Sequence, residues 1–461
     1  MTEKKYLKWY NKVGYGSGDI AGNVVYAFLS SFVMIFLTDT VGLNAGIVGT
    51  LMMFSKLFDG VTDIFFGSMI DKTKSKMGKA RPWMLWAYFG CAAMIIAIFA
   101  IPVSLGEGAK YAWFFIAYTA LNAVFYTANN IAYSALTSLI TKNSSERVQM
   151  GSIRFMFAFG TSLLIQTITV NAVEALGSGA EAWRTIAIIY AVIGLIVNTI
   201  STLSVKELPA EVLDEAASEQ EIQKAEKYNL VQAIKLLGAN KFYIIICCIY
   251  ILTQIFTATI NMGIYFMTYI LGDASLLGVF ALAINIPLIC GLIFTPMLVK
   301  KFNGMYKINL VGYAIATVAR GLVIVAGYMG NLPMMLLFSG VASIGMSPLQ
   351  GDLNALIASC SEYTFLTKQK RIDGTMFSCT SLGVKIGGGI GTALAGWLLA
   401  ASGYVANAPE QVESCINMLY FMYLWIPMII NLIITLLLSK LKVEQANAEI
   451  EAKKSLASSD K

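Results

Sequence analysis

The sequence predicts an all-α integral membrane protein with twelve transmembrane helices in two six-helix bundles. Of the 461 residues, 57% are apolar and only 13% are charged, against about 25% charged residues in soluble proteins. Apolar stretches long enough to cross a bilayer, about 20 residues each, recur along the chain. One long polar segment divides these stretches six and six, which is typical of two parallel repeats around an axis along the membrane normal.

The helices follow one another in order, separated by short connections. The expected spans are 16–38, 45–70, 82–102, 110–140, 153–176, 183–204, 242–271, 277–300, 306–328, 332–359, 374–402 and 417–440. Residues 1–204 are expected to form the N-terminal bundle and 242–440 the C-terminal bundle. Residues 205–241, rich in Glu, Ala and Lys, form the linker, and 441–461 form a tail with a short solvated helix or disorder. The leader has no small-residue cleavage site, which predicts that the first span is retained.

Lysine and arginine gather in alternate loops, and this pattern predicts the orientation. The N-terminal leader, the even-numbered loops and the tail are basic, whereas the opposite loops hold only Lys110 and Arg184. By the positive-inside rule, both termini and the linker are expected to be cytoplasmic, in a multi-pass protein of the cell (inner) membrane. The net charge of +6 then reflects topology, and no nucleic-acid partner is expected.

The composition also limits the chemistry. The chain has no histidine, so proton chemistry must use carboxyl groups, lysine or tyrosine. Seven cysteines, an odd number that falls mostly in apolar runs, predict no disulfide framework. Because no nucleophile and base of known spacing are present, we expect neither an enzyme nor a cofactor.

Two aspartates in the second span, Asp59 and Asp63, are the most informative charges. A carboxylate near the bilayer centre costs about 2.5–3.5 kcal/mol or more, so such groups face a cavity, a partner or an ion path. Spacing of four places both side chains on one helix face. Like charges so placed repel unless a cation or proton lies between them. A structural network with Lys56 or Arg154 is the alternative interpretation.

Oxygen ligands near this pair favour a hard monovalent cation. Thr62 lies between the aspartates in sequence, and Thr127 lies on the fourth span. The sequence therefore predicts a Na⁺ site at Asp59 and Asp63, although a proton carried by a buried carboxyl is equally compatible.

Further polar residues inside spans indicate a cavity for a polar solute. Asp19 sits among glycines one turn into the first helix, where it alternatively caps the helix. Lys385 also lies among glycines, and alternatively only neutralises an aspartate. The mixture of aromatic, amide and charged groups that suggests a sugar comprises Tyr26, Tyr126, Asn129, Asn130, Arg154, Tyr265 and Lys385.

Several motifs together carry a resemblance to a known family. They are GYGSGDIAGNVVY, FLTDTVGLNAGIVGTL, KLFDGVTDIFFGSMIDKTKSKMGKARPW, YTANNIAYSAL, ERVQMGSIRFMFAFG and EYTFLTKQKRIDGTMFSCTSLGVKIGGGIG. Over nearly its whole length the chain resembles the glycoside–pentoside–hexuronide:cation symporters, the melibiose permease group of the major facilitator superfamily.

The resemblance implies alternating-access symport of a sugar with Na⁺, Li⁺ or H⁺. Separately from the resemblance, we expect the protein to function as a monomer. Asp59 and Asp63 match the cation-site aspartates, with Thr127 as a nearby hydroxyl ligand. The residues expected to bind substrate are Asp19, Tyr26, Tyr126, Asn130, Arg154, Ser381 and Lys385. Those expected to act in gating are Asp71, Lys79, Arg81, Glu362 and Arg371.

The chain also departs from the melibiose-type pattern. Asn130 stands where those permeases have an aspartate, and Ser134 lies close to the position of a tryptophan, so no galactoside preference is implied. Ala355 and Ser359 replace the usual acids at the end of helix 10, leaving Asp352 as the acid nearby. The charge network of the cytoplasmic gate therefore differs from the pattern.

The expected mechanism is linkage, in which a bound cation organises the cavity for sugar and each ligand raises the affinity of the other by the same factor. Three alternatives stay open from the sequence. They are an intramembrane enzyme, a sugar sensor that does not transport, and a carrier of lysolipids or other amphiphiles on the same fold.

Overall fold

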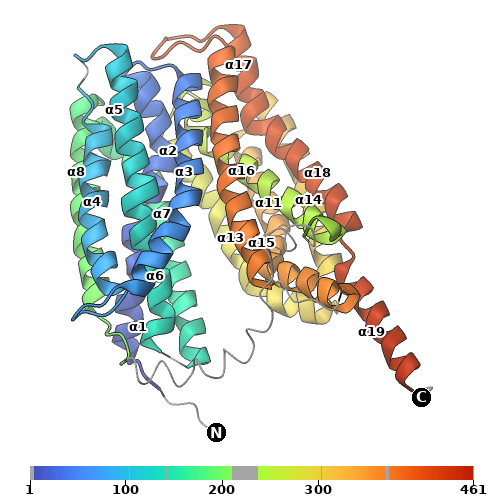
Figure 1. Ribbon diagram of the computed structural model, residues 1–461. Coiled ribbons are helices and arrows are strands. Elements are labelled where there is room, and N and C mark those ends of the chain that lie inside the picture. Colours follow the sequence, from blue (N-terminus) through green and yellow to red (C-terminus); the bar gives the residue numbers. More distant parts are fainter. Residues whose placement is uncertain are drawn as a thin grey trace. The chain divides into compact units, whose positions relative to one another are not determined.

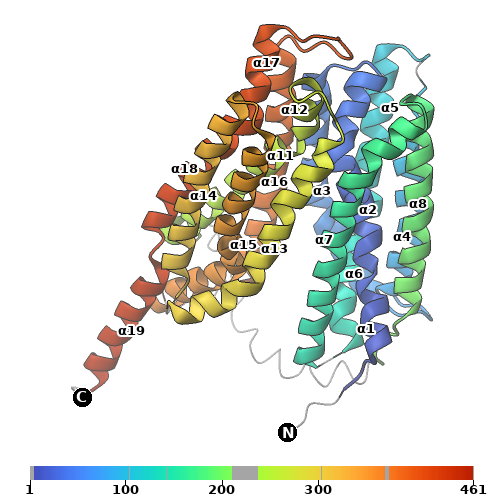
Figure 2. The ribbon, with the colours of Figure 1, turned by 180° about the vertical axis from the view of Figure 1, so that it is seen from behind.

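The structure is a computed structural model that describes residues 5–102, 104–141, 143–209, 237–302, 304–368 and 373–459. In these ranges every regular element is a helix (Figures 1 and 2).

The first half of the chain contains long helices, two of which include a π-helical segment. The elements are α1 (Trp9–Gly16), α2 (Gly18–Ile35), η1 (Phe36–Thr40), α3 (Ala45–Lys72), α4 (Arg81–Phe99), α5 (Glu107–Thr119), η2 (Ala120–Tyr126), α6 (Thr127–Ile140), α7 (Ser144–Ala175) and α8 (Ala180–Leu203). The second half also consists of helices, one of which includes a π-helical segment. Its elements are α11 (Lys241–Asn261), α12 (Gly263–Tyr269), α13 (Leu276–Lys301), α14 (Met305–Tyr328), α15 (Leu332–Lys368), α16 (Asp373–Ala401), α17 (Glu413–Tyr420), η3 (Phe421–Trp425), α18 (Ile426–Lys440) and α19 (Val443–Ser459).

The predicted helices are confirmed, with three clear errors at their ends. The first begins at Trp9 rather than 16, the fifth at Ser144 rather than 153, and the tenth ends at Lys368 rather than 359. In each case the helix continues past its apolar stretch into a more polar segment. At α7, for example, the Asn143 side chain accepts a hydrogen bond from the N–H of Glu146 at 3.0 Å. The tail is helical from Val443 to Ser459. Of the two predictions for the tail, a short helix or disorder, the helix is therefore the one observed.

Ten helical stretches among the described residues are long and apolar enough to cross a membrane. Two more stretches, α3 and the run from α5 to α6, are as long but more polar. The first carries Lys56, Asp59 and Asp63, and the second carries Asn122, Asn129 and Asn130. The twelve together match the predicted spans, and the two polar ones carry the residues of the predicted cation site.

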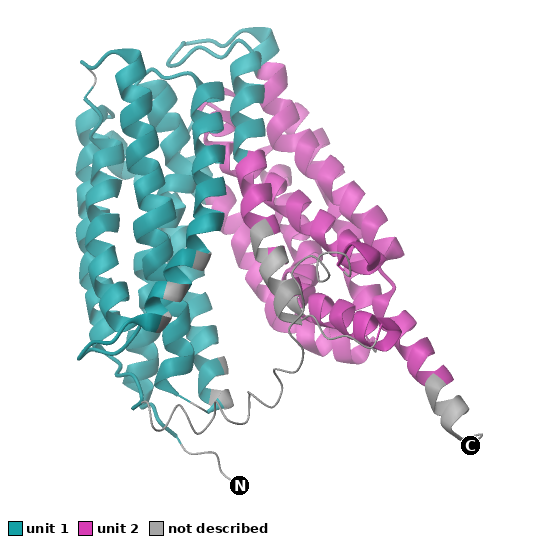
Figure 3. Ribbon diagram, in the orientation of Figure 1, with its two compact units in different colours: residues 1–226, 273–278, 392–415 teal, residues 227–272, 279–391, 416–461 magenta. Residues whose placement is uncertain are grey.

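The chain contacts define two compact units (Figure 3). Unit 1 contains residues 1–226, 273–278 and 392–415, and unit 2 contains 227–272, 279–391 and 416–461. The end of α16 therefore belongs to unit 1 and its beginning to unit 2. The predicted bundle boundaries, 1–204 and 242–440, stay a prediction.

Aromatic side chains fill the core of unit 1. Phe28 of α2 stacks on Phe99 of α4, with ring centroids 4.3 Å apart, and Phe99 stacks on Trp183 of α8 at 6.0 Å. Such pairs stabilise more than their buried area alone. They fix α2, α4 and α8 against one another.

Close backbone approach holds unit 2 together. Gly312 of α14 and Gly345 of α15 face each other so tightly that a Cβ on either would meet the carbonyl oxygen of the other. Phe266 stacks on Tyr423, with ring centroids 4.8 Å apart. Arg320 is 2% exposed, and its guanidinium carbon lies 5.2 Å from the ring centroid of Phe256, within the range of a cation–π contact.

Candidate functional site

Asp59 of α3 lies against Thr127 of α6. The Thr127 hydroxyl is hydrogen-bonded to Oδ1 of Asp59 and lies 2.8 Å from the backbone oxygen of Asn122. Thr127 is buried, with 4% of its surface exposed. The structure thus brings together two of the residues that the sequence assigned to the cation site. Their role as ligands stays a prediction.

A π-helical segment sets the position of Thr127. The segment η2 ends at Tyr126, and the N–H of Thr127 donates back to the carbonyl of Asn122, five residues earlier. Its hydroxyl reaches the same carbonyl. Single π-helical turns inside α-helices are frequent at functional sites, because the wider turn displaces a side chain from the ordinary helical face. Nothing in the sequence of this stretch predicted the π segment.

The remaining residues of the predicted cation site follow on α3. Asp63 lies one turn after Asp59 and is half-buried. The Thr62 hydroxyl donates its proton to the backbone oxygen of Asp59 at 3.1 Å, which leaves its two lone pairs as acceptors. Lys56, one turn earlier, is attracted by the charge of Asp59, and its Nζ lies 3.5 Å from Oγ1 of Thr392. In the alternative interpretation, a structural charge network at Asp59 and Asp63, Lys56 is therefore the cation.

Tyrosines connect this region to Asp19. Tyr126 lies within electrostatic range of Asp19, of Asp59 and of Tyr26. A Cβ at Gly22 of α2 would lie 3.7 Å from the Tyr126 hydroxyl, so no side chain separates Tyr126 from that helix. Tyr26 is 51% exposed, and Asn130 is exposed on α6. Both predicted substrate residues are therefore accessible.

Asp19 and Arg154 form an ion pair. Nε of Arg154 on α7 lies 2.6 Å from Oδ2 of Asp19 on α2, and their side chains are 23% and 17% exposed. The same Oδ2 accepts a hydrogen bond from the Tyr133 hydroxyl at 3.0 Å. No side-chain capping bond occurs at the start of α2, so the capping alternative for Asp19 is wrong. Arg154 pairs with Asp19 rather than with the aspartates of α3.

Two tyrosines that the sequence did not single out support this pair. The Arg154 guanidinium carbon lies 4.1 Å from the ring centroid of Tyr133 and 5.9 Å from that of Tyr15. The Tyr15 hydroxyl donates to the backbone oxygen of Tyr133 at 2.7 Å and lies 2.6 Å from Oγ1 of Thr137. Aromatic residues in spans are ordinary packing residues, so only the three-dimensional contact distinguishes these two.

Glycines before Asp19 allow this arrangement. A Cβ at Gly18 would lie 2.8 Å from the Tyr133 ring and 2.8 Å from Oγ of Ser201, and a Cβ at Gly16 would lie 2.5 Å from Ile153. The helices that approach closely at these glycines are α6, α7 and α8. This approach brings Tyr133 and Arg154 within reach of Asp19.

Two residues that the sequence assigned to the cavity serve packing instead. The Asn129 amide donates to the backbone oxygen of Met84 at 2.6 Å and to Oδ1 of Asn198 at 3.0 Å. Tyr265 is fully buried in the core of unit 2. A buried amide is satisfied by partners on neighbouring helices, and the sequence does not reveal on which face those partners lie.

The substrate candidates of unit 2 lie on α16. Lys385 is half-buried. Beyond it, Gly387 and Gly391 pack against α11, where a Cβ would lie 3.1 Å from Cα of Ile251 and 3.0 Å from Cα of Ile255, respectively. Ser381 lies on the same helix, and its side chain is outside the described part.

The gating residues are only partly described. Glu362 is half-buried on α15. The side chain of Asp71 and the whole of Arg371 lie outside the described residues. The predicted pairing across the gate therefore stays a prediction.

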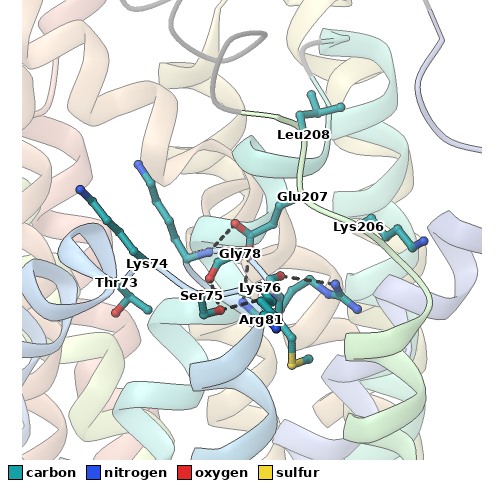
Figure 4. A pocket seen from close by; sticks show the side chains of 11 residues that line it. Thr73, Lys74, Ser75, Lys76, Gly78, Arg81, Lys206, Glu207 and Leu208 are labelled. Atoms are coloured by element: carbon teal, nitrogen blue, oxygen red, sulfur yellow. Dashed lines mark hydrogen bonds between the residues drawn. The ribbon is translucent and has the colours of Figure 1, made fainter.

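The basic loop before α4 is closed by Glu207, which the sequence analysis placed in the linker. The Glu207 carboxylate accepts hydrogen bonds from the backbone N–H groups of Lys79, Ala80 and Arg81 at 2.7–3.0 Å. Nε of Arg81 donates to the backbone oxygen of Thr202 at 3.0 Å. Figure 4 shows Glu207 and Arg81 among the residues that line a cavity of about 560 Å³. Lys79 thus contributes its backbone, and Arg81 is bound to the end of α8.

A second carboxylate, Glu146, fixes the N-terminal leader. It is 2% exposed and accepts hydrogen bonds from the N–H groups of Tyr6 and Leu7 at 3.2 and 3.1 Å and from the Thr141 hydroxyl at 2.7 Å. Nζ of Lys12 lies 3.4 Å away. Burial alone raises the pKa of Glu146, but these hydrogen bonds and the lysine outweigh it, so the pKa lies below its usual value.

The repeated membrane spans and the ion pair between Asp19 and Arg154 inside them are features of a multi-pass membrane protein with a polar internal site. The chain belongs to the MFS/sugar transport protein family, whose model matches residues 14–445. The predicted resemblance to the glycoside–pentoside–hexuronide:cation symporters is confirmed. Since the relatives and the structural neighbours are transporters, the enzyme alternative is set aside.

Three comparisons illustrate these relations. The chain is 28% identical to the isoprimeverose transporter of Lactiplantibacillus pentosus, over 93% of this chain and 88% of that protein. It is 26% identical to a putative glycoside/cation symporter of Escherichia coli (strain K12), over 96% and 94%. Its fold resembles that of a bacterial homologue of the human lysosomal transporter Spinster, with a TM-score of 0.70, 14% identity, and coverage of 96% and 99%.

Proposed function

We propose that this chain is a sugar:cation symporter that works by alternating access. The coupled ion is Na⁺, Li⁺ or H⁺, bound at Asp59 and Asp63 with oxygen ligands from Thr62 and Thr127. The sugar is a glycoside, pentoside or hexuronide. Membership of a sugar transport family and the names of the two relatives, a transporter of isoprimeverose and a putative glycoside/cation symporter, support this class.

The bond network of Thr127 carries the proposal of a cation at Asp59. A hydroxyl has one proton, yet the Thr127 oxygen lies within hydrogen-bond distance of two acceptors, Asp59 Oδ1 and the carbonyl of Asn122. With Asp59 ionised, only one acceptor receives the proton. A proton on Asp59 satisfies both, and a metal ion next to the two oxygens removes their repulsion. The network therefore favours an occupied carboxylate.

Coupling to sugar follows from the neighbouring tyrosine. Tyr126 lies within electrostatic range of both Asp19 and Asp59. Neutralising one of these carboxylates therefore changes the electric field at the other carboxylate and at its ligand. Sugar binds at Asp19, Tyr26, Tyr126, Asn130 and Arg154, with Ser381 and Lys385 contributing from α16. Each ligand then raises the affinity of the other by the same factor, and the doubly occupied transporter changes its exposure to the two sides.

The remaining assignments complete this proposal. The protein acts as a monomer in the cell (inner) membrane, with both termini and the linker in the cytoplasm. The gate uses Asp71, Lys79, Arg81, Glu362 and Arg371. Labelling of single cysteines introduced at Lys74, which is exposed, and at Lys110, which is half-buried, tests the orientation, because only the first is expected to react from the cytoplasmic side.

Transport in liposomes tests the function. Purified protein is reconstituted and given an inward Na⁺ or pH gradient with labelled glycosides, pentosides and hexuronides in turn. At one-to-one coupling, a tenfold ion gradient supports about tenfold accumulation of the accepted sugar. Absence of accumulation for every sugar under every gradient would refute the proposal.

Matched variants test the cation site. Asp59→Asn and Asp63→Asn are expected to abolish stimulation by the cation, whereas Glu174→Gln, an exposed acid of unit 1, is expected to leave it intact. Thr127→Val is expected to raise the cation concentration for half-maximal uptake about tenfold, and Thr127→Ser, which keeps the hydroxyl, to leave it near the wild-type value. Normal cation stimulation in both aspartate variants would contradict the assignment.

A further inference from the structure

Two cavities of unit 1 meet at the loop between α3 and α4. The basic cavity, of about 560 Å³, is the one that Glu207 and Arg81 line (Figure 4). The apolar cavity, of about 460 Å³, is lined mainly by side chains of α3, α4 and the run from η2 to α6, among them Phe66, Trp83 and Trp86. Thr73 and Ser75 line both cavities. A charged surface and an apolar surface therefore share one edge.

The lysines of the basic cavity have no acidic partner among the described residues. No carboxylate in those ranges forms an ion pair with Lys74, Lys76 or Lys206, and all three side chains are exposed. Glu207 is the acid among the lining residues, and its carboxylate is bonded to the backbone N–H groups of residues 79–81. The cavity thus carries an excess of positive charge, which attracts an anion.

The shared edge is fixed by hydrogen bonds within the protein. The Thr73 hydroxyl donates to the backbone oxygen of Met69 at 2.8 Å and accepts from Nε1 of Trp83 at 2.7 Å. The Ser75 hydroxyl donates to the backbone oxygen of Gly78 at 2.7 Å. Because both hydroxyl protons are used by the protein, an anion in the basic cavity is bound by the cations rather than by this edge.

The shared edge lies at the boundary between membrane and water. Helix α4 has 19 residues and is therefore about 28 Å long, close to the thickness of the hydrocarbon core. The basic loop precedes this helix directly, and Trp83 and Trp86 lie in its first two turns. Trp86 is 66% exposed and stacks on Phe89, with ring centroids 5.6 Å apart. Tryptophan at the end of a span is typical of the headgroup level of a bilayer.

An anionic phospholipid matches both surfaces at once. Its phosphate is the kind of anion that basic pockets beside membrane spans bind, and its acyl chains gain from covering exposed aromatic rings. Between phosphate and chains lies the glycerol, which corresponds to the edge at Thr73 and Ser75. A soluble anion leaves the apolar cavity unused, and a lipid without net charge leaves the lysines uncompensated.

We infer that the α3–α4 loop and the first two turns of α4 bind one anionic phospholipid, with its phosphate in the basic cavity and an acyl chain in the apolar cavity. None of the residues proposed to bind cation or sugar lines either cavity. The site therefore goes beyond the proposed function, and its failure and the failure of sugar transport are separate results. Lys79 and Arg81, proposed for the gate, line the basic cavity, so a bound lipid changes the charge beside them.

Lipid binding to the purified full chain tests the inference. Dioleoyl phosphatidylglycerol is titrated into the protein in a non-ionic detergent, and the complex is measured by native mass spectrometry. Dioleoyl phosphatidylcholine has the same chains without net charge, and glycerol 3-phosphate has the anion without chains. We expect the first phosphatidylglycerol to bind at least about tenfold more tightly than either. Equal affinity of phosphatidylcholine overturns the inference, and equal affinity of glycerol 3-phosphate overturns it in favour of a site for soluble anions.

Matched lysine variants test the basic cavity. The triple change Lys74→Gln, Lys76→Gln and Lys206→Gln is expected to lower the affinity for phosphatidylglycerol about tenfold or more and to remove its advantage over phosphatidylcholine. The control replaces three exposed lysines of unit 2 by glutamine, at Lys300, Lys301 and Lys307. It changes the net charge equally and should leave the affinity unchanged. Equal losses in the two triple variants overturn the inference, because net charge alone would then explain the binding.

A tryptophan variant tests the apolar cavity. Trp86→Ala is expected to weaken the binding of both phospholipids about tenfold while preserving the preference for phosphatidylglycerol. Trp113→Ala, at a tryptophan of α5 that is 40% exposed, should change neither affinity. Wild-type affinity for both lipids in Trp86→Ala overturns the inference, because the acyl chain would then lie elsewhere.

A measurement on the unaltered protein covers a variant that does not fold. Lysines are acetylated with and without phosphatidylglycerol at ten times its Kd, and the modified positions are identified by mass spectrometry. Occupancy at that concentration should slow acetylation of Lys74, Lys76 and Lys206 about tenfold and leave Lys300, Lys301 and Lys307 unaffected. Uniform protection of all six lysines, or protection of none, overturns the inference.

Discussion

The beginnings of α4 in unit 1 and of α14 in unit 2 are each capped by a glutamate from a distant part of the sequence. Helix α8 ends at Leu203 and α18 at Lys440, and a glutamate follows each end four residues later. Glu207 accepts three backbone N–H bonds at the start of α4. Glu444 accepts bonds from two backbone N–H groups at the start of α14, at 2.9–3.1 Å. We call these the Glu207 clasp and the Glu444 clasp.

The parallel extends to the neighbouring residues. A glycine with positive φ precedes each helix, Gly78 at +106° and Gly304 at +142°. In each unit a side chain of the first helical turn also reaches the carbonyl five residues before the glutamate. Nε of Arg81 donates to the Thr202 oxygen at 3.0 Å, and the Tyr306 hydroxyl donates to the Ser439 oxygen at 3.0 Å.

The difference lies in the charge. The cavity at the Glu207 clasp is lined by the basic side chains of Lys74, Lys76, Lys79, Arg81 and Lys206. At the Glu444 clasp the donor to the preceding helix is the neutral Tyr306, and one cation, Nζ of Lys442, lies 5.9 Å from the centroid of its ring. The capping of backbone N–H groups by a glutamate is thus repeated in the two halves, whereas the charge of the surrounding side chains is not. The corresponding helix start is therefore stabilised by a carboxylate in both halves, although the neighbouring side chains differ.

The largest expected effect is the loss of stability on replacing Gly78 by alanine, which should exceed the loss at Gly304. Gly78→Ala places a Cβ against the Glu207 carboxylate at a positive φ, which costs about 3 kcal/mol of unit 1 stability from backbone strain and the lost cap. At Gly304 the nearest carboxylate oxygen lies 3.2 Å from a Cβ, so Gly304→Ala is expected to cost about 1–2 kcal/mol.

Buried thiols measure this difference unit by unit. Cys91 of unit 1 and Cys360 of unit 2 are both fully buried, so variants that retain one or the other report local opening by their labelling rate. Gly78→Ala should accelerate labelling of Cys91 and not of Cys360, and Gly304→Ala the reverse. Equal acceleration of both thiols by either change would show that the clasps are not local to their units.

The second expected effect compares the carboxylates themselves. Glu207→Gln removes the negative charge from three N–H groups and from Arg81, at an expected cost of about 2 kcal/mol, and Glu444→Gln about 1 kcal/mol. The same two thiols and the melting temperature in detergent provide the measurement, with Glu451→Gln, an exposed acid of α19, as the control. A larger effect at Glu444 would reverse the ranking derived from the bond counts.

The sequence predicted the helices and the charged site residues for a clear physical reason. Charges inside apolar spans are costly, so Asp19, Asp59, Asp63 and Arg154 stand out without any structure. Helix ends were less accurate, because α7 and α15 continue as polar helices past the apolar stretch, where hydropathy carries no signal.

The clasps and the tyrosines could not be predicted in this way. Glu207 and Glu146 lie at the polar ends of spans, where an acid is ordinary, and their function depends on loops that return from distant parts of the chain. In the sequence, Tyr15 and Tyr133 look like packing residues. Only the structure shows that their rings contact the guanidinium of Arg154. Their roles are tertiary and therefore invisible to local pattern.

Acid pH sharpens the comparison through Glu146, a third carboxylate clasp in unit 1. Because its folded-state pKa is lowered, its contribution is complete at neutral pH and is lost as pH falls below about 4.5 toward the folded-state value. We expect faster labelling of Cys91 in this range, and Glu146→Gln should weaken that pH dependence. Glu174→Gln serves as the matched control. Identical acid profiles for wild type and Glu146→Gln would assign the acid sensitivity to other groups.

The smallest expected effect concerns the side chains that reach back to the end of the preceding helix. Arg81→Gln loses a charged donor to the Thr202 carbonyl and is expected to cost about 1–1.5 kcal/mol, whereas Tyr306→Phe loses one neutral hydrogen bond to Ser439, at about 0.5–1 kcal/mol. Both residues are only half-buried, so water partly replaces the lost donors. Since guanidinium bonds in water-accessible sites weaken with salt, raising the ionic strength should shrink the Arg81→Gln effect and leave Tyr306→Phe unchanged. An equal salt dependence of the two variants, read from the Cys91 and Cys360 labelling rates, would mean that charge is not what distinguishes the two clasps.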